Sequence, residues 1–305
     1  MSTYALRRFG HAVFVVFGVS LIVFGLMFLT GDPTLLMLPT DAGVAEIEAF
    51  RKTMGFDRPV WEQYYRYVSR AVRGDLGESL WHRQSALSLI IERVPATLQL
   101  AFSALAVTLM IGIPVGIIAA LNRGTLVDTL ATVGAVAGNS MPPFWLGIML
   151  ILVVSVRFRL LPASGRGGIV HLILPSITLG AYSASVTARL LRSSLIDVLS
   201  KDYVRTARAK GLSERAVIYR HSLKNAALPV VTIVGLQMGS LLGGAIITET
   251  VFAYPGMGLL AIQAIRNRDV PVVQAFVIVM AMVILLVNLT VDVFYRFLDP
   301  RIRYS

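Results

Sequence analysis

Six segments of this chain are each long and apolar enough to form a helix across a lipid bilayer. A helix needs about 20 predominantly apolar residues to span the hydrocarbon core. The segments lie near residues 11–29, 97–121, 129–155, 172–191, 229–252 and 272–295. This pattern predicts an all-α integral membrane protein with six transmembrane helices.

The composition agrees with a membrane protein rather than a soluble one. The 305 residues are 56% hydrophobic and only 15% charged, with a mean hydropathy of +0.73. The formal net charge is +11, from 28 basic and 17 acidic residues. Basic residues clustered on cytoplasmic loops produce such an excess, so it does not indicate nucleic-acid binding. The absence of cysteine excludes disulfides and thiolate metal sites.

The basic residues also predict the orientation of the chain. Lysine and arginine are enriched on the cytoplasmic side of membrane proteins. If six spans alternate, one side receives Arg7, Arg8, Arg123, the segment 201–229, Arg296, Arg301 and Arg303. We therefore expect both termini of this multi-pass protein in the cytoplasm. Arg157, Arg159 and Arg166 fall on the opposite side and run against this pattern.

The first apolar run is expected to be a retained helix. Arg7 and Arg8 before an apolar stretch also fit a secretory signal peptide. The run from His11 to Leu29 is longer than an ordinary signal core, and no A-x-A cleavage pattern follows Leu29. A membrane-anchored N-terminus is the interpretation that follows.

The region from Gly31 to about Pro95 is expected to form a small solvated external region. It contains eight basic and nine acidic residues, without a large excess of either sign. Helices are expected near Val44–Met54 and Trp61–Val72. The expected breaks are at Gly55, Pro59, Gly74 and Gly77. The predicted organisation is residues 1–95 as the first helix plus external region, 96–296 as a five-helix core with a cytoplasmic loop at about 193–228, and 297–305 as a cytoplasmic tail.

Small residues recur inside two of the predicted spans. They are Ser176, Gly180, Ser183 and Ser185 in the fourth span and Gly235, Gly239, Gly243 and Gly244 in the fifth. Small side chains let membrane helices approach closely. The two overlapping G-x-x-x-G spacings serve packing either within this chain or between subunits.

A basic segment between the fourth and fifth spans is expected to contact a partner. Residues 201–229 carry seven basic and two acidic side chains. Two short helices are expected, the first capped by Asp202 and ended by Gly211, the second capped by Ser213 with Glu214 near its positive end. Tyr203, Val204 and Ala207 share one face of the first helix, which suits a groove in a soluble protein. Binding of anionic lipid headgroups is the alternative.

The same segment carries a resemblance to a known family. DYVRTARAKGLSERAVIYRHSLKNAALPVVT resembles the cytoplasmic coupling motif of ABC-importer permeases of the dipeptide, oligopeptide, glutathione and nickel branch. Further similar stretches are GDP at 31–33, GFDRPVWEQYYRYV at 55–68, GDLGES at 74–79, VFAYPGMG at 251–258 and the terminal VDVFYRFLDPRIRYS. The resemblance covers nearly the whole chain and implies the type I ABC importer permease fold.

In such permeases the coupling helix docks into a cleft of an ATP-hydrolysing subunit. The resemblance implies this role for Tyr203, Val204, Arg205, Thr206, Ala207, Arg208, Gly211 and Leu212. Arg205, Thr206 and Ala207 occupy the Glu-Ala-Ala positions of the general family, with only the last alanine kept. Leu228-Pro229 also lies farther from Gly211 than in the general pattern. Arg205 is therefore not assigned the role of a glutamate.

The resemblance also implies partners for this chain. They are a second homologous permease subunit, two ABC ATPase subunits and an extracytoplasmic solute-binding protein. None of the four lysines lies in the G-x-x-x-x-G-K-[ST] loop that holds nucleotide phosphates. ATP and Mg²⁺ are thus expected on the partner subunits, with no cofactor on this non-catalytic chain. The four dispersed histidines do not have the spacing of a metal site.

Polar groups at membrane depth are costly, so they face other helices or a water-filled path. Gln99, Asn139, Gln237, Glu249 and Asn288 are such residues.

Glu249 precedes a stretch in which Tyr254, Pro255 and Gly256 are expected to break the helix. These four residues are the candidates for an external gate, and structural hydrogen bonding is an equal alternative for Glu249. Pro142-Pro143 is expected to kink the third span.

The leading interpretation is import of di- and oligopeptides, with glutathione, nickel chelates and opines as alternatives within the same importer type. A secondary transporter is a rival, but the chain shows no inverted repeat and no buried charge relay. A membrane-embedded enzyme is a second rival, but the converging nucleophile, base or metal-ligand residues that it needs are missing. A membrane scaffold that only recruits a partner is a third. The substrate-binding residues are not predicted, because specificity in this branch is thought to lie largely in the separate binding protein.

Overall fold

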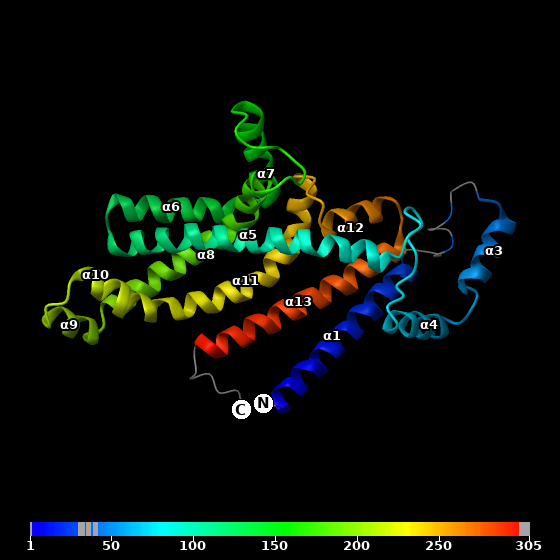
Figure 1. Ribbon diagram of the computed structural model, residues 1–305, viewed down its shortest axis with the longest axis horizontal. Coiled ribbons are helices and arrows are strands. Elements are labelled where there is room, and N and C mark those ends of the chain that lie inside the picture. Colours follow the sequence, from blue (N-terminus) through cyan, green and yellow to red (C-terminus); the bar gives the residue numbers. More distant parts are fainter. Residues whose placement is uncertain (1, 30–33, 35–37, 39–41, 299–305) are drawn as a thin grey trace. The chain divides into compact units, whose positions relative to one another are not determined.

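The protein is all-helical in the residues that the computed structural model describes, 2–29, 34, 38 and 42–298, apart from one isolated β-bridge between Glu78 and Ser85. The elements in chain order (Figure 1) are α1 (Ser2–Leu29), α3 (Val44–Met54), α4 (Val60–Val72), α5 (Ala86–Leu121), α6 (Leu126–Ser140), α7 (Pro143–Leu150), the π-helix η1 (Ile151–Arg157), α8 (Ile169–Leu199), α9 (Asp202–Ala209), α10 (Glu214–Ala216), the π-helix η2 (Val217–Ser222), α11 (Leu223–Val251), α12 (Met257–Arg266) and α13 (Val270–Leu298). The predicted fold class, an all-α membrane protein, is confirmed. The motif at 31–33 and residues 299–305 of the predicted tail lie outside the described residues.

Four helices in the described part of the chain are long and apolar enough to cross a bilayer, and a bent pair raises the number to five. The four comprise α5, α8, the helical run Glu214–Val251 and α13 through Val291. The first predicted span falls on α1, a helix of 28 residues whose described apolar part is Val13–Gly25. The number of six spans therefore stays a prediction. Helix α5 begins at Ala86, ahead of the predicted start of the span near 97, and the added part includes the charged Glu92 and Arg93.

The predicted third span, near 129–155, is not one continuous helix. Helix α6 ends at Ser140, α7 begins at Pro143, and the helical segments on either side of this break differ in direction by 105°. Met141 and Pro142 are both extended, with ψ of 124° and 136°. Each precedes a proline, and the proline ring disfavours the helical conformation of the residue before it. Pro142-Pro143 therefore breaks the helix rather than kinking it.

The chain forms two compact units. One combines the chain up to Ala96 with Pro255–Leu286, and the other combines Thr97–Tyr254 with the part of α13 from Val287. The second unit contains the basic segment and two of the four predicted gate residues, Glu249 and Tyr254.

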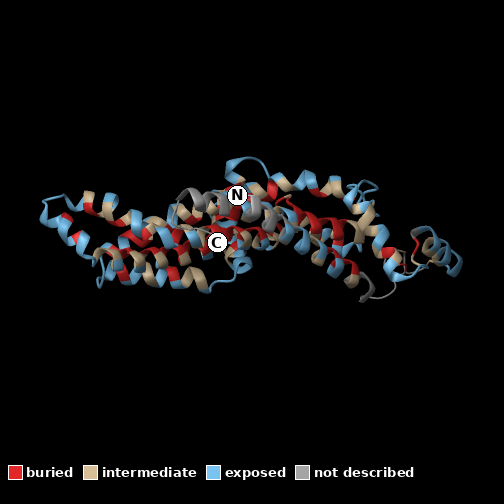
Figure 2. Ribbon diagram, turned by 90° about the horizontal axis from the view of Figure 1, so that it is seen from below, coloured by how far each residue is buried: buried red, intermediate tan, exposed pale blue. Residues whose placement is uncertain are grey.

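Helices α5 and α8 in the second unit approach so closely that their glycines touch backbone. A Cβ atom on Gly112 would lie 2.9 Å from the carbonyl oxygen of Ala184, and one on Gly180 would lie 2.6 Å from that of Ala104. The hydroxyl of Thr108 donates to the Gly180 carbonyl at 3.2 Å. Figure 2 shows buried residues along the helices that pack in this unit. Close packing was predicted for Gly180, whereas Gly112 of α5 was not singled out.

The G-x-x-x-G glycines of α11 are packed differently. A Cβ atom on Gly243 would meet nothing within 4 Å, and one on Gly239 would meet only Asn288 Oδ1 at 3.8 Å. Gly244 is the glycine beside another helix, since its Cβ position lies 3.1 Å from Leu179 Cδ1. Close packing of α11 within this chain therefore involves Gly244 rather than Gly243.

An ion pair joins α6 to α8. The Arg192 guanidinium donates to both carboxylate oxygens of Asp128, at 2.6 and 2.7 Å. The Asp128 side chain is 8% exposed and also accepts from the Gly124 backbone N–H at 3.0 Å. Paired, hydrogen-bonded geometry of this kind offsets the cost of burying a carboxylate.

The first unit contains the predicted external helices. Both are confirmed, as α3 and α4. Gly55 ends α3 in the left-handed conformation at φ 73°. Ser79 donates a hydrogen bond to the buried Asp269 carboxylate, which also accepts from the Leu80 N–H at 3.3 Å. This carboxylate holds the turn that follows α4 against the start of α13.

Replacing Gly180 with alanine tests the close contact between α5 and α8. The added Cβ would overlap the Ala104 carbonyl oxygen, and a backbone atom cannot rotate away. We expect Gly180→Ala to lower the free energy of unfolding by about 1–3 kcal/mol, the usual cost of overpacking. The measurement is thermal unfolding of the purified protein in detergent.

The matched control is Gly134→Ala in α6, where a Cβ meets nothing within 4 Å. Equal stability of the two variants would contradict the contact.

Candidate functional site

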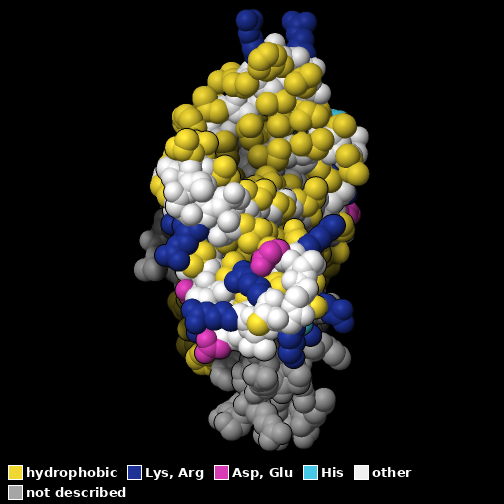
Figure 3. Space-filling model, turned by 90° about the vertical axis from the view of Figure 1, so that its left-hand side faces the viewer, with side chains coloured by type: hydrophobic (Ala, Val, Ile, Leu, Met, Phe, Trp, Pro, Cys, Tyr) yellow, Lys and Arg dark blue, Asp and Glu magenta, His cyan; other side chains and the backbone are white. Residues whose placement is uncertain are grey.

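The basic segment forms a compact helical turn at one end of the second unit. It consists of α9, α10 and η2, and η2 leads directly into α11. Figure 3 looks at the end of the molecule that carries α9 and α10 and shows lysine and arginine side chains gathered there, with few acidic ones between them. The two predicted short helices are thus present, and the second continues through a π-helix into the long helix.

Local sequence signals explain where these helices begin and end. Gly211 lies at φ 76°, in the left-handed region that favours glycine, and its N–H donates to the Arg208 carbonyl at 2.9 Å. The Ser213 hydroxyl accepts from the Ala216 N–H at 3.3 Å and caps α10. Both predictions are confirmed. The predicted Asp202 cap is wrong, because Lys201 holds the cap position and Asp202 is the first helical residue.

The apolar side of α9 is buried within this chain. Val204 is fully buried, Ala207 is 7% exposed, and both pack with the fully buried Val217 of η2. Val198 and Leu199, at the end of α8, complete this cluster. The prediction that Val204 and Ala207 face a partner groove is therefore wrong, because the same apolar face seats α9 on the membrane helix before it.

The other side of α9 is presented to the surroundings. Among the predicted coupling residues, the exposed ones on α9 are Tyr203, Arg205, Thr206 and Arg208, and Gly211 and Leu212 are exposed in the turn that follows. Tyr203 is 43% exposed, and its hydroxyl accepts from the Asn225 amide of α11 at 3.0 Å. This bond links the exposed face to the start of the next membrane helix.

A salt bridge joins the two short helices across the Gly211 turn. Arg208 donates to both carboxylate oxygens of Glu214, at 2.7 and 3.3 Å. The hydrogen bond from Arg208 lowers the pKa of Glu214 below its ordinary value. Both groups therefore remain charged near neutral pH, and the contribution of the pair is lost only as acid protonates Glu214.

A polar cluster, buried at Thr97, Glu249 and Tyr254 and exposed at Gln99 and Arg166, lies where α5 meets the end of α11. Glu249 is fully buried, and its carboxylate accepts from the Thr97 hydroxyl at 2.6 Å. The fully buried Tyr254 donates its hydroxyl to Gln99 Oε1 at 3.2 Å. The same oxygen accepts from the Arg166 guanidinium at 2.9 Å. Two of the predicted gate residues, Glu249 and Tyr254, thus each bond to α5.

The loop before α8 is tied to this cluster by its backbone as well. The Gly165 N–H donates to the Phe252 carbonyl at 2.9 Å, just after α11 ends. Together with Arg166, this bond holds the loop over the end of α11. Arg166 and Thr97 were not predicted as site residues, and the only signal for Arg166 was a positive charge on the predicted external side.

The helix break predicted at Tyr254-Pro255-Gly256 is confirmed. Helix α11 ends at Val251 and α12 begins at Met257. The Tyr254 N–H donates to the Glu249 carbonyl at 2.8 Å, which closes the end of α11. The Glu249 carboxylate also accepts from Thr97, so the structural hydrogen bonding expected as one of two alternatives for Glu249 is present. Its role in a gate stays a prediction.

Among the described residues, no group of three or more histidine, cysteine, aspartate or glutamate side chains is arranged to hold a metal ion.

The chain matches two families of known proteins. Residues 112–304 match the family described as binding-protein-dependent transport system inner membrane component, and residues 1–101 match the N-terminal family of such membrane components. Among curated relatives, the dipeptide transport system permease protein DppB of Escherichia coli strain K12 is 40% identical in an alignment of 342 residues. The glutathione transport system permease protein GsiC of E. coli O6:H1 strain CFT073 is 44% identical over 306 residues. Both alignments cover 100% of each chain.

Solved structures share the fold at low sequence identity. An inward-facing conformation of the MetNI methionine ABC transporter matches with a TM-score of 0.59 at 18% identity, over 69% of this chain and 96% of that one. An amino acid ABC transporter with histidines matches with a TM-score of 0.52 at 16% identity, over 70% and 94%.

The family matches cover nearly the whole chain, and the full-length relatives are permeases. This chain therefore belongs to the inner-membrane permease subunits of binding-protein-dependent ABC transporters, which are non-catalytic and act with ATPase and solute-binding partners.

Proposed function

We propose that this permease subunit imports di- and oligopeptides across the cytoplasmic membrane. It pairs with a second homologous permease subunit, two ABC ATPase subunits that bind ATP and Mg²⁺, and an extracytoplasmic binding protein that delivers the peptide. Both termini and the α9–α10 turn lie in the cytoplasm. The observation that carries the proposal is the geometry of α9, which is seated on α8 by Val204 and Ala207 and presents a basic face on its other side.

In this proposal α9 transmits movement as a rigid body. Val204 and Ala207 are packed against the end of α8, and the Tyr203–Asn225 bond links α9 to α11. A displacement of the exposed face therefore moves the cytoplasmic ends of two membrane helices together. ATP binds the closed state of the ATPase pair more tightly, and this difference in affinity drives the switch from inward-facing to outward-facing.

Two relatives support different peptide substrates. The alignment with the dipeptide permease is 342 positions long. It exceeds the 305 residues of this chain by 37 positions (342 − 305). The glutathione permease aligns over 306 residues at 44% identity, with almost no gaps. Glutathione is itself a tripeptide, so both relatives favour a peptide over nickel chelates or opines. Glutathione is the second candidate, favoured by this agreement in length.

Transport by the assembled complex tests the function. Proteoliposomes would carry this chain with its operon-encoded permease, ATPases and binding protein, and the measurement is uptake of labelled dipeptide, tripeptide, glutathione and nickel chelate. ATP-dependent uptake of dipeptide or tripeptide is the expected result. Uptake of glutathione alone would replace the substrate, and ATP-independent uptake would contradict the importer assignment.

A pair of substitutions at Gly211 tests the coupling role. A Cβ there meets nothing within 4 Å, so the strain of a larger residue comes only from the left-handed backbone at φ 76°. Asparagine tolerates that conformation and valine does not. We expect Gly211→Val to reduce ATP-driven uptake at least about fivefold and Gly211→Asn by less than about threefold, since strain of about 1–3 kcal/mol falls on valine.

Membrane insertion of both Gly211 variants, measured by quantitative immunoblot, is the control. Equal uptake by the valine and asparagine variants would rule out a conformational role for this turn.

The cluster at the end of α11 is the proposed external gate, formed by Glu249, Tyr254, Pro255 and Gly256. Arg166 holds the loop over it through Gln99. Replacing Arg166 with methionine removes one hydrogen bond from a charged donor at an exposed site, worth about 1 kcal/mol. We expect the gate equilibrium to shift about fivefold toward open, so that more ATP is hydrolysed per peptide imported.

Arg157→Met is the matched control for this test, since Arg157 is an exposed arginine at the end of η1. The ratio of ATP hydrolysed to peptide imported is measured for both variants. An unchanged ratio in Arg166→Met would count against the gate.

A further inference from the structure

Helix α4 has three distinct sides, and one of them is apolar but uncovered. At about 100° per residue, Trp61, Tyr65, Val68 and Val72 fall on one stripe. Trp61 is 73% exposed, Tyr65 is 72% exposed and Val72 is 83% exposed, while Val68 is partly buried. An exposed stripe of large apolar side chains indicates a surface that contacts a membrane or another protein.

The second side of α4 packs on α1. Tyr64 lies edge-on to Phe17 and Phe24, with ring centroids 6.0 and 5.2 Å apart. Its hydroxyl lies within hydrogen-bonding distance of the Ser20 hydroxyl, at 2.9 Å. Tyr67 packs on Phe24 with centroids 5.8 Å apart. This side borders the exposed stripe, so the two together form one continuous apolar sector.

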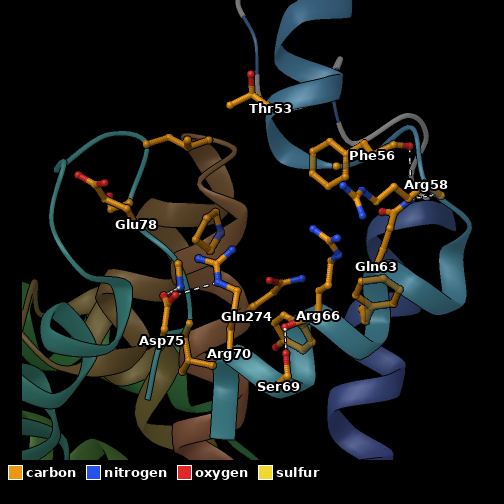
Figure 4. Close-up of a pocket in the computed structure, with 18 of the residues that line it drawn as sticks. Thr53, Phe56, Arg58, Gln63, Arg66, Ser69, Arg70, Asp75, Glu78 and Gln274 are labelled. Carbon is orange, nitrogen blue, oxygen red and sulfur yellow. Dashed lines mark hydrogen bonds and ion pairs between the residues drawn. The ribbon is translucent and has the colours of Figure 1, made fainter. Parts of the chain in front are cut away.

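The third side of α4 is charged and faces a pocket of about 810 Å³. Figure 4 shows Arg66 and Arg70 projecting from α4 into this pocket. Arg70 pairs with Asp75 at 2.8 Å, and Arg66 pairs with Glu62 at 3.2 Å. The pocket gives these charges polar neighbours on the side of α4 opposite the exposed stripe, and Phe24 and Tyr67 also line it.

The place of α4 along α1 identifies what covers the stripe. Helix α1 has 28 residues, or about 42 Å at 1.5 Å per residue, which is enough to cross a bilayer. Its contacts with α4 lie between Phe17 and Phe24, within its apolar stretch. At that level α1 also exposes Leu21 and Ile22, 50% and 62% accessible, and lipid is the neighbour expected for apolar side chains on a helix that crosses a bilayer. The uncovered stripe of α4 is held at the same level.

We infer that α4 lies against the lipid bilayer, with Trp61, Tyr65, Val68 and Val72 inserted among the lipids. Amphipathic helices with aromatic residues on the apolar side and arginines on the polar side bind membranes in this way. Tryptophan and tyrosine are also enriched at the membrane interface. The helix thus anchors the region after α1 to the bilayer surface, independently of the substrate and of the transport mechanism.

Cysteine scanning tests this directly, because the chain contains no cysteine of its own. Single cysteines at Tyr65, Val68 and Val72 would be spin-labelled, with Arg66, Ser69 and Arg73 as matched neighbours on the polar side. The assembled transporter, without binding protein, would be placed in nanodiscs of phosphatidylethanolamine and phosphatidylglycerol. The measurement is the collision rate of each label with oxygen, which concentrates in lipid, and with a water-soluble nickel chelate.

The ratio of the oxygen rate to the chelate rate is expected above one at 65, 68 and 72 and below one at 66, 69 and 73. Addition of the binding protein is expected to leave the apolar-side ratios unchanged. Ratios below one on both sides would overturn the inference. Labels at 65, 68 and 72 that are water-exposed alone and become shielded when the binding protein is added would overturn it too, since the stripe would then be a protein-docking surface.

Discussion

The exclusion of water from the bilayer interior is the constraint on which the rest of this structure depends. Backbone groups without water must bond within their own segment, so the chain crosses as helices and turns polar groups toward one another. Because lipid tails are themselves apolar, the hydrophobic effect does not hold these helices together. Close approach of one helix backbone to another does so instead. Gly112 and Gly180 allow that approach between α5 and α8. The polar exceptions, Asp128 with Arg192 and Glu249 with Thr97, are paired across helices.

In the proposed function, α9 joins two membrane helices to a partner outside the membrane. Helix α9 is small, but its buried side is packed against the last turn of α8, and its tyrosine bonds to the first turns of α11. A contact on its exposed side therefore acts on two helices at once. At the other end of α11, the buried Tyr254 and the Arg166 loop meet at Gln99 of α5. A shift of α11 is thereby connected to both the proposed coupling surface and the proposed gate.

Much of this could be predicted from the sequence, where a local signal determines a local structure. Gly211 ends α9 and Ser213 caps α10 because backbone conformation and capping depend on one or two neighbouring residues. Long-range packing was harder to predict. Val204 and Ala207 were assigned to a partner groove, but the facing Val217 lies ten residues beyond Ala207 and covers them (217 − 207 = 10). Arg166 reaches Gln99 across 67 residues, and no sequence pattern indicates that distance in space.

The central claim is that the exposed side of α9 is the contact with the ATPase subunits. Single cysteines at Arg205 and Thr206, introduced into this cysteine-free chain, would be treated with a short membrane-permeable crosslinker in the assembled complex. A cysteine at Val72, in the region expected on the opposite side of the membrane, is the control. The account predicts crosslinks to the ATPase subunit from 205 and 206, changed in yield by ATP, and none from 72. No crosslink from 205 or 206, or an equal yield from 72, would contradict it.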